Sequence, residues 1–563
     1  MFRKFLKYYD PEVFIEAGHI IRGRVKNIDN DDPLDRTEEI ADIFAHFRNP
    51  DKETVLTPWR VVNMHVGKVF GGLSFYDNEY RYTTDQGNTA AHWIQTDVTD
   101  RIFNPDAHIL EINSKTGLYP LFETASLYYQ AFKKMNDQMA GKFTLQDEQA
   151  LWENILANNI YVIAKTPMAK VITERTLAGY HNWKMNVKYI DGLVDSLKKS
   201  IPESVEKVKK GFGKQMKFDA VIGNPPYQDT SKGDNDTFKA PLYNLFTDLA
   251  YKLSDRVSLI TPARYLFGAG STPKKWNEEM LNDPHLKIVM YEAKSNEIFA
   301  NTDIKGGIVI TYRDKNQDFG KIGVFKPFKE LDWILKKVKD REDFKEFSQI
   351  VYSRTSYRIT EKLHQDYPEA EKYLSKGHRY DMSTNIMDLL PFVFYKDKPQ
   401  DKYEYIKIFG RTANQRTYQY IRRDYVNQVD NLDKWKVFVP KSNGSGALGE
   451  VLTTPVIGQP VIGQPVIGHT ESFISIGCFD SESEANACLK YVKTKFARCM
   501  LGILKVTQDN PPDRWRFIPL QDFTNQSDID WSESIHDIDL QLYKKYKLDQ
   551  KEIDFIESHV QAM

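Results

Sequence analysis

The sequence predicts an α/β protein whose main sheet is mostly parallel and carries helices on both faces. Three observations favour this fold. From Thr57 to about residue 330, short apolar runs typical of buried strands alternate with amphipathic stretches typical of helices. Hydrophobic residues make up 41% and charged residues 28% of the 563 residues, so the chain can bury a sizeable core. From Tyr352 onward the alternation gives way to a polar region rich in Tyr, Arg, Lys, Asn and Gln, which indicates a second domain.

The alternating region predicts its elements in a definite order. Strands are expected at residues 107–112, 159–164, 186–190, 218–223, 256–260, 286–291, 307–312 and 321–325. Helices are expected at residues 119–136, 167–177, 241–253 and 273–281. Thr166-Pro167 has the residue types of a helix N-cap and first helical position. Because ligands bind beyond the carboxyl ends of strands where the strand order reverses, we expect a site in the loops after Ile112, Ile190 and Gly223.

Composition divides the chain into three regions. Residues 1–50 are charged and predict a helical N-terminal extension, residues 51–330 the α/β domain, and residues 331–563 a second domain that ends in amphipathic helices. A five-residue repeat at 455–469 is too short for a solenoid and predicts an expanded loop or edge segment. Residues 444–449 fit G-x-G-x-x-G, but no helix signal follows them, so we interpret them as a flexible loop.

Charge and cysteine content narrow the classes of function. The chain has 77 Lys and Arg against 78 Asp and Glu, so a net charge of −1 excludes a uniformly basic nucleic-acid coat but not a local basic groove. The three cysteines and the histidines show no metal-ligand spacing, and we expect no metal. The sequence shows no targeting segment and no long apolar stretch, which favours a soluble, cytoplasmic protein.

The strongest local signal is Asn224-Pro225-Pro226-Tyr227, directly after a predicted strand. Two consecutive prolines fix the backbone and donate no N–H, so the Asn224 carboxamide and nearby carbonyls are held as acceptors. Tyr227 adds a flat aromatic face on which a flipped base can stack. If the Asn224 side-chain oxygen and the Pro225 carbonyl each accept one N–H of an adenine amine, its lone pair turns toward an electrophile.

This segment resembles the catalytic motif of S-adenosylmethionine-dependent amino methyltransferases, above all N6-adenine DNA methyltransferases. The resemblance implies a Rossmann-like class I methyltransferase sheet, S-adenosylmethionine as cofactor, and Asn224, Pro225, Pro226 and Tyr227 as catalytic residues. Because the cofactor segments precede the motif and a long polar region follows it, the order resembles the gamma arrangement, with a C-terminal α+β target-recognition domain. Glutamine N5-methyltransferases and some RNA methyltransferases look similar at these four residues.

Other segments resemble the family's cofactor site. Residues 111–117 occupy the place of its acidic residue and Gly-rich turn, although Lys115 replaces a glycine. The second acidic position of the family falls near Ala164, where this sequence has no carboxylate. The resemblance implies the cofactor-binding residues Thr57, Glu111, Asn113, Thr116, Gly117 and Asp191.

A local basic segment lies in the predicted second domain. Residues 407–423 contain five Lys or Arg and no Asp or Glu, with Asn, Gln and Tyr between them. Arg can bind guanine and Asn or Gln adenine through paired hydrogen bonds, while cations neutralise phosphate. We predict DNA-binding roles for Arg411, Arg416, Arg422 and Arg423, and a solvated charged face is the alternative.

Together these patterns favour a site-specific adenine-N6 DNA methyltransferase of a bacterial restriction–modification system. Its expected partners are double-stranded DNA and an endonuclease or helicase, with no membrane. One alternative is a methyltransferase that acts on RNA or on a protein glutamine. Another is a DNA-binding modification subunit, or a fragment of a larger restriction enzyme, with a weakened cofactor site at Lys115 and Ala164.

Overall fold

The chain consists of two compact units, residues 1–324 and 325–563. The computed structural model describes residues 10–47, 55–82, 91–138, 144–213, 217–229, 240–302, 304–444, 446, 448–454 and 458–563. Within these ranges, no helix has both the length and the apolar character that a membrane span requires.

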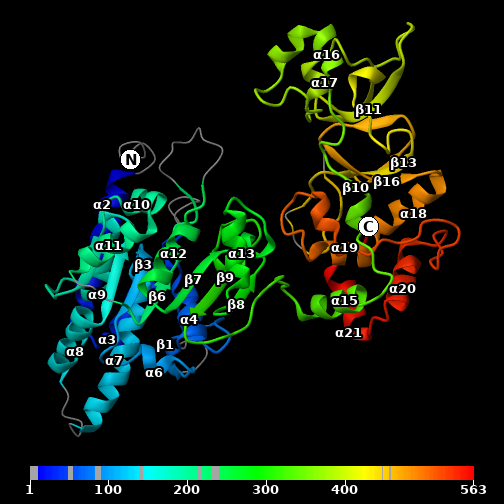
Figure 1. Cartoon of the computed structure of the whole chain (residues 1–563). Helices are drawn as coiled ribbons and strands as arrows, with labels where there is room; N and C mark the ends of the chain where they lie inside the picture. Colours follow the sequence, from blue (N-terminus) through cyan, green and yellow to red (C-terminus); the bar gives the residue numbers. More distant parts are fainter. Residues whose placement is uncertain are drawn as a thin grey trace. The chain divides into compact units, whose positions relative to one another are not determined.

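The first unit is built on a seven-stranded sheet with the strand order β5-β4-β3-β6-β7-β9-β8 (Figure 1). Its strands are β3 (Ile109–Ser114), β4 (Ile160–Ala164), β5 (Asn186–Tyr189), β6 (Ala220–Gly223), β7 (Arg256–Pro262), β8 (Leu286–Glu292) and β9 (Ile308–Asp314). All neighbours from β5 to β7 are parallel, and β9 is antiparallel to both β7 and β8. The predicted α/β fold with a mostly parallel sheet is therefore confirmed. The eighth predicted strand, 321–325, is wrong, because Gly320 and Gly323 turn the chain there with φ of 78° and 62°.

The strand order reverses between β3 and β6. From β3 the chain moves outward through β4 to β5, and it then returns to the other side of β3 as β6. The loops that follow β3 and β6 therefore leave the sheet at its switch point, which is where ligands bind in open α/β sheets.

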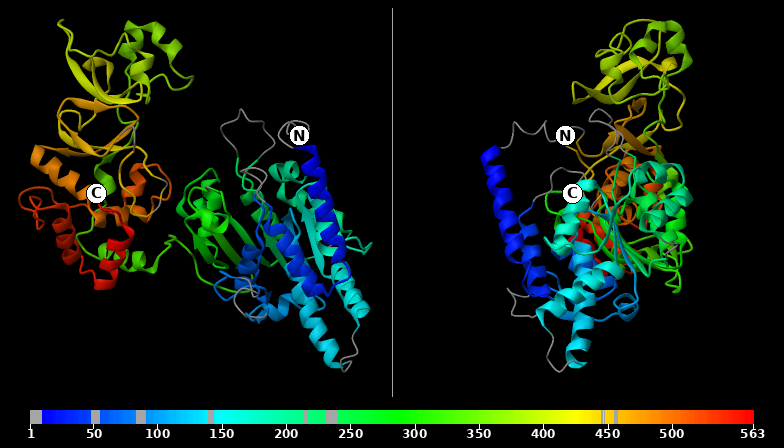
Figure 2. Two further views of the ribbon diagram at one scale, coloured as in Figure 1. Left: turned by 180° about the vertical axis from the view of Figure 1, so that it is seen from behind. Right: turned by 90° about the vertical axis from the view of Figure 1, so that its left-hand side faces the viewer.

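Helices cover both faces of this sheet (Figure 2). They are α2 (Pro11–Asn27), α3 (Pro33–Ala45), α4 (Trp59–Val69), α6 (Thr99–Ile102), α7 (Leu118–Gln138), α8 (Leu145–Asn158), α9 (Pro167–Ala178), α10 (Leu193–Lys199), α11 (Ile201–Phe212), α12 (Tyr243–Leu253), α13 (Lys274–Asn282) and α14 (Ser295–Ile298). On one face α7 packs against α3, α4 and α9, while α10, α11 and α12 pack together on the other. Thr166 caps α9 by accepting a hydrogen bond from the Ala169 N–H at 3.0 Å, with Pro167 first in the helix, as predicted. A short ribbon of β1 (Gly72–Ser74) and β2 (His92–Ile94) completes the unit.

Side chains of the central strands alternate between two buried clusters. Ile109, Val162 and Ile222 belong to the cluster that includes residues of α4 and α7. Leu110 and Val221 belong to the cluster that includes residues of α11 and α12. Both faces of the sheet are thus buried at its central strands, which explains why β4 and β6 are continuous apolar runs.

The second unit contains a four-stranded sheet, β10-β16-β13-β14, and a three-stranded sheet, β12-β11-β15. Its strands are β10 (Val351–Tyr352), β11 (Tyr405–Thr412), β12 (Gln415–Arg422), β13 (Trp435–Pro440), β14 (Val461–Gly463), β15 (Ile467–His469) and β16 (Phe473–Phe479). Its helices are α15 (Lys329–Lys339), α16 (Glu361–Asp366), α17 (Ile386–Leu389), α18 (Glu482–Lys493), α19 (Lys495–Gly502), α20 (Ile535–Lys545) and α21 (Gln550–His559). Strands β11 and β12 form a hairpin through Ala413 and Asn414, both with positive φ, which is the backbone of a tight two-residue turn.

The five-residue repeat lies in this unit. Its second copy supplies β14 and its third copy β15, so the predicted edge segments are short strands. Residues 455–457 of the first copy lie outside the described residues. The predicted C-terminal amphipathic helices are α20 and α21, and Asp549 and Glu552 form a capping box at the start of α21.

Candidate active site

The predicted catalytic loop leaves the sheet at the carboxyl end of β6. Gly223 ends this strand with φ of +151°, and a Cβ atom at this position would lie 2.5 Å from the Ile112 carbonyl oxygen of β3. Only glycine therefore allows the loop to approach β3 this closely. Pro225 and Pro226 follow without backbone donors, so the acceptors beside them are not consumed by local N–H groups.

Asn224 is held from three sides. Its side chain is 3% exposed, and its Nδ2 donates a hydrogen bond to Thr57 Oγ1 at 3.1 Å. Its backbone carbonyl accepts hydrogen bonds from Asn113 Nδ2 at 2.8 Å and Lys115 Nζ at 3.3 Å. The Asn224 Oδ1 atom is buried and has no hydrogen-bond partner within the described part of the chain. A buried acceptor without a donor is costly, which indicates a position that a ligand N–H completes.

A small cavity joins Asn224 to Glu111. Its volume is about 10 Å³, close to the space that one water molecule requires. The lining residues are Thr57, Glu111, Asn113, Lys115, Thr116, Leu118, Tyr119 and Asn224. Four of the six predicted cofactor residues thus meet the predicted catalytic asparagine around one space.

The charged groups at this cavity are shifted toward their neutral forms. Burial raises the pKa of the Glu111 carboxyl to about 8, although Ser114 and the Lys115 ammonium lower it. Burial and the nearby Lys165 lower the pKa of Lys115 to about 7, while Glu111 raises it. The Glu111 Oε2 atom is buried without a partner among the described residues. A cation placed beside Glu111 would favour the ionised carboxylate.

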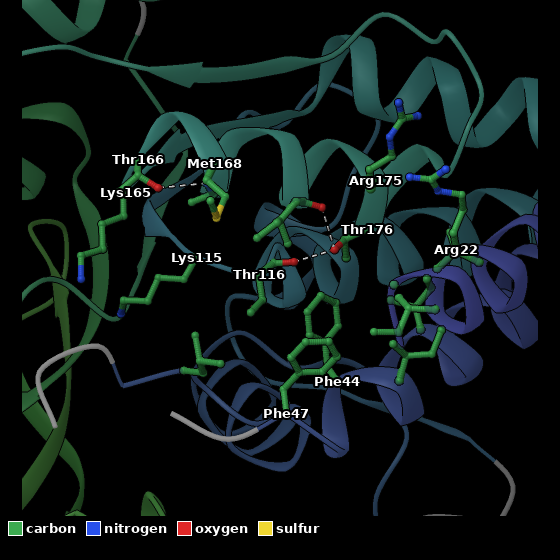
Figure 3. Close-up of a pocket in the computed structure, with 18 of the residues that line it drawn as sticks. Arg22, Phe44, Phe47, Lys115, Thr116, Lys165, Thr166, Met168, Arg175 and Thr176 are labelled. Atoms are coloured by element: carbon green, nitrogen blue, oxygen red, sulfur yellow. Dashed lines mark hydrogen bonds between the residues drawn. The ribbon is translucent and has the colours of Figure 1, made fainter. Parts of the chain in front are cut away.

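A larger cavity of about 580 Å³ shares Lys115 and Thr116 with the small one (Figure 3). Lys115 and Lys165 lie at one end, Arg22 and Arg175 at the other, and apolar residues such as Phe44 line the space between. No Asp or Glu is among its described lining residues. Its volume is in the range of pockets that hold small-molecule ligands.

Five other predicted residues of the first unit do not line either cavity, namely Gly117, Asp191, Pro225, Pro226 and Tyr227. Asp191 follows β5 and is exposed, with its Oδ1 accepting a hydrogen bond from the Tyr189 hydroxyl at 3.2 Å. Gly117 has φ of +83°, and a Cβ there would lie 3.0 Å from Thr173 Cα, so its role is to let the start of α7 approach α9. Tyr227 is half-buried, and its hydroxyl has no partner within the described residues.

The sequence did not single out three residues that the structure places beside the site. Glu123 of α7 is 1% exposed, both of its carboxyl oxygens lack partners among the described residues, and burial and Glu111 raise its pKa well above the ordinary value. Tyr119 lines the small cavity, and its hydroxyl is hydrogen-bonded to the buried His65 at 2.7 Å. The sequence signal for these residues was a polar side chain at a helix position where the spacing predicts an apolar one. Such side chains are usually core groups with hydrogen-bond partners, so this signal alone does not indicate a functional site.

The predicted DNA-binding arginines lie on the β11–β12 hairpin of the second unit and differ in their surroundings. Arg411 donates a hydrogen bond to the side chain of Asn414 within the hairpin, and Arg416 lies over the Phe409 ring at 4.9 Å. Arg422 pairs with Asp366 and Asp424, and its side chain is 12% exposed. Arg423, which directly follows β12, pairs with Glu404 and Asp433.

Comparison with known proteins supports the class of this site. Residues 158–299 match the family described as Eco57I restriction-modification methylase, a segment that contains the Asn224 loop. An uncharacterized adenine-specific methylase of Mycoplasma pneumoniae is 29% identical over 135 residues, which are 22% of this chain and 31% of that protein. The chain thus spans about a third of that relative's length.

Two solved structures resemble the chain at low identity. The Type ISP restriction-modification enzyme LlaGI, solved as a nuclease-deletion mutant with a DNA substrate mimic, is 12% identical with a TM-score of 0.42, covering 90% of this chain and 47% of that one. The Type IIL restriction-modification enzyme MmeI, solved in complex with DNA, is 9% identical with a TM-score of 0.40, covering 81% of this chain and 73% of that one.

The strand order, the loop after β6 and the cavity that joins it to Glu111 define a Rossmann-like methyltransferase domain. Segment 158–299 of this domain is similar to the family described as Eco57I restriction-modification methylase. The predicted class is confirmed at this level.

Proposed function

We propose that this protein is an S-adenosylmethionine-dependent methyltransferase that modifies the N6 atom of adenine in DNA, as the modification enzyme of a bacterial, cytoplasmic restriction–modification system. One observation carries the proposal: Asn224, whose buried Oδ1 has no partner among the described residues, lines a cavity that also contains Glu111. The family match at residues 158–299 and the Mycoplasma relative described as adenine-specific support it.

The residues around the two cavities fit the cofactor by charge. S-adenosylmethionine carries a positive sulfonium, an ammonium group and a carboxylate. The unpartnered Glu111 Oε2 suits the positive groups, and the Lys115 and Lys165 ammonium groups suit the carboxylate. These residues, with Thr57, Asn113 and Thr116, would hold the cofactor, which supplies an electrophilic methyl carbon when bound. The missing carboxylate near Ala164 means that ribose recognition differs from the family pattern.

The chain's own contribution to the reaction is position and hydrogen bonding. Asn224 Oδ1 and the Pro225 carbonyl accept the two amine hydrogens of a flipped adenine, which draws its lone pair out of the ring and toward the methyl carbon. Tyr227 stacks on the flipped base. Thr57 keeps the Asn224 carboxamide turned so that its oxygen, not its nitrogen, remains available.

We assign target recognition to the second unit and double-stranded DNA as the partner. The β11–β12 hairpin with Arg411 and Arg416 supports this assignment, because these two cations have no carboxylate partner within the described residues. An endonuclease or helicase, as a separate subunit or as part of a longer chain, is the expected companion of such a modification enzyme.

Substrate comparison tests the proposal. Methyl incorporation from labelled S-adenosylmethionine is measured with duplex DNA, RNA and a protein extract, followed by sequencing of modified bases in a host genome with and without the protein. We expect N6-methyladenine at one recurrent DNA sequence. Transfer to RNA or to protein glutamine would replace the DNA assignment with one of those substrates. Absence of cofactor binding at millimolar ligand would favour the DNA-binding subunit instead.

A further inference from the structure

A chain of buried hydrogen bonds connects the small cavity to the backbone of strand β9. The hydroxyl oxygen of Tyr119, near the start of α7, is 2.7 Å from His65 Nδ1. The Nε2 atom of His65, in α4, is 2.8 Å from Ser258 Oγ of β7. Ser258 Oγ donates a hydrogen bond to the Thr311 carbonyl of β9 at 2.8 Å. His65 and Ser258 are 0% exposed and Tyr119 is 2% exposed, so water does not compete for these groups.

The direction of every proton in this chain follows from its last member. A carbonyl can only accept, so Ser258 uses its single proton on Thr311. Its oxygen must then accept a proton from His65 Nε2–H. Burial lowers the pKa of His65 to about 3, so the ring is neutral and its Nδ1 carries no proton. Nδ1 therefore accepts the hydroxyl proton of Tyr119.

This arrangement of protons makes the Tyr119 hydroxyl a hydrogen-bond acceptor toward the small cavity. Because the Tyr119 proton is directed to His65, the phenol oxygen keeps only lone pairs for any group in the cavity that Tyr119 lines. Burial, Glu111, Tyr227 and Glu123 raise the pKa of Tyr119 well above its ordinary value, so it stays protonated. Asn224 Oδ1, which also lines this cavity and has no partner among the described residues, can only accept, and the Glu111 carboxyl becomes an acceptor when a cation favours its ionised form.

We propose that Tyr119 is a cofactor-binding acceptor for the positively charged amino-acid end of S-adenosylmethionine, and that His65 and Ser258 are positioning residues that keep its hydroxyl proton out of the cavity. This assignment rests on the proposed function. It adds Tyr119 of α7, His65 of α4 and Ser258 of β7 to the predicted cofactor residues. In the sequence, His65 lies 54 positions from Tyr119 and 193 positions from Ser258.

Calorimetric titration of the full chain tests the assignment with two ligands. S-adenosylmethionine carries the ammonium group, while 5′-methylthioadenosine lacks the whole amino-acid end. Tyr119→Phe removes the acceptor, and we expect S-adenosylmethionine affinity to fall about 10- to 100-fold, the usual effect of losing a hydrogen bond to a charged group. The affinity for 5′-methylthioadenosine should stay within about twofold of the wild type, which is the scale of a neutral substitution.

The positioning role is tested at His65 and Ser258. His65→Leu removes the acceptor for the Tyr119 proton, whereas His65→Gln keeps one acceptor and one donor and should restore most of the affinity. Ser258→Ala frees His65 to carry its proton on Nδ1, which turns the Tyr119 hydroxyl toward the cavity. We expect both His65→Leu and Ser258→Ala to weaken the binding of S-adenosylmethionine but not that of 5′-methylthioadenosine. In a Tyr119→Phe background, His65→Leu should cause no further loss of S-adenosylmethionine affinity.

The titrations distinguish a wrong role for Tyr119 from a wrong methyltransferase assignment. A wild-type protein that binds neither ligand contradicts the methyltransferase assignment itself. A wild type that binds S-adenosylmethionine, with Tyr119→Phe binding equally well, overturns the role of Tyr119. Equal losses for both ligands, or additive effects of His65→Leu and Tyr119→Phe, indicate a general packing role and overturn the positioning role.

Discussion

The Asn224 side chain donates its amide nitrogen to Thr57 Oγ1 at 3.1 Å and leaves its oxygen buried without a partner among the described residues. Thr57 directly precedes Pro58, the N-cap of α4, so a segment 167 residues upstream fixes the orientation of the catalytic loop.

Thr57→Val should slow methyl transfer. The substitution removes the acceptor of the Asn224 amide and leaves a buried N–H unsatisfied, which costs about 1–3 kcal/mol and lets the carboxamide rotate. We expect kcat to fall on the order of tenfold or more. Thr57→Ser keeps the hydroxyl and should remain close to the wild type. Single-turnover methylation of duplex DNA measures the effect, and equal rates for the valine and serine variants would contradict the role of the hydroxyl.

Glu111→Gln should change the pH dependence of stability. The ordinary pKa of a glutamate is 4.5, and burial raises that of Glu111 to about 8. Between these values the unfolded chain ionises Glu111 while the folded chain keeps it neutral, so the wild type loses stability as pH rises. The variant lacks this loss, and its stability relative to the wild type should rise from pH 5 to pH 7.

Urea denaturation at pH 5, 6 and 7 measures that difference. The neighbouring titratable groups Lys115, Tyr119 and Glu123 are present in both proteins and their pKa values respond to Glu111, so the difference reports the Glu111 carboxyl together with its effect on these neighbours. Glu342→Gln, measured over the same pH range, serves as a control for the carboxyl-to-amide change at an exposed position. A difference between Glu111→Gln and the wild type that stays constant from pH 5 to pH 7 would show that the Glu111 carboxyl is not held neutral.

Gly223→Ala should destabilise the first unit. Its φ of +151° is unfavourable for alanine, and the new Cβ would lie 2.5 Å from the Ile112 carbonyl oxygen. We expect a loss of about 1–3 kcal/mol or more in the free energy of unfolding. Gly23→Ala in α2 meets nothing within 4 Å and should be neutral or stabilise by about 0.5–1 kcal/mol. Similar unfolding curves for both variants would contradict the close approach of β6 to β3.

The hairpin arginines should separate into two groups in DNA binding. Arg411→Gln with Arg416→Gln should reduce the slope of log affinity against log salt by about 0.9 for each phosphate contact that is lost. Arg422→Gln breaks the pairs with Asp366 and Asp424 and should mainly lower thermal stability. Filter binding across a salt series gives the slopes. A larger slope change for Arg422→Gln than for the Arg411→Gln, Arg416→Gln variant would show that Arg422 contacts phosphate.

The central strands β3, β4, β6 and β7 were predictable because each is a largely apolar run that the sheet buries. Helices α8, α10 and α11 were not, because the alternation rule expects one helix between strands and the chain places two in succession. Asn224 could be found because it directly follows β6, and Glu111 because it is an acidic residue inside the buried strand β3 beside the switch point. The His65–Tyr119 contact could not, because it depends on how α4 packs against α7 across 54 positions.

The most direct test of the central claim is methyl transfer by Asn224→Ala. The variant removes the unpartnered Oδ1 and leaves Glu111, Lys115 and the hairpin arginines in place. Labelled methyl transfer to duplex DNA is measured beside the affinities for DNA and S-adenosylmethionine. We expect transfer to be abolished while DNA affinity stays close to that of the wild type. Transfer at the wild-type rate would show that Asn224 does not hold the reacting amine.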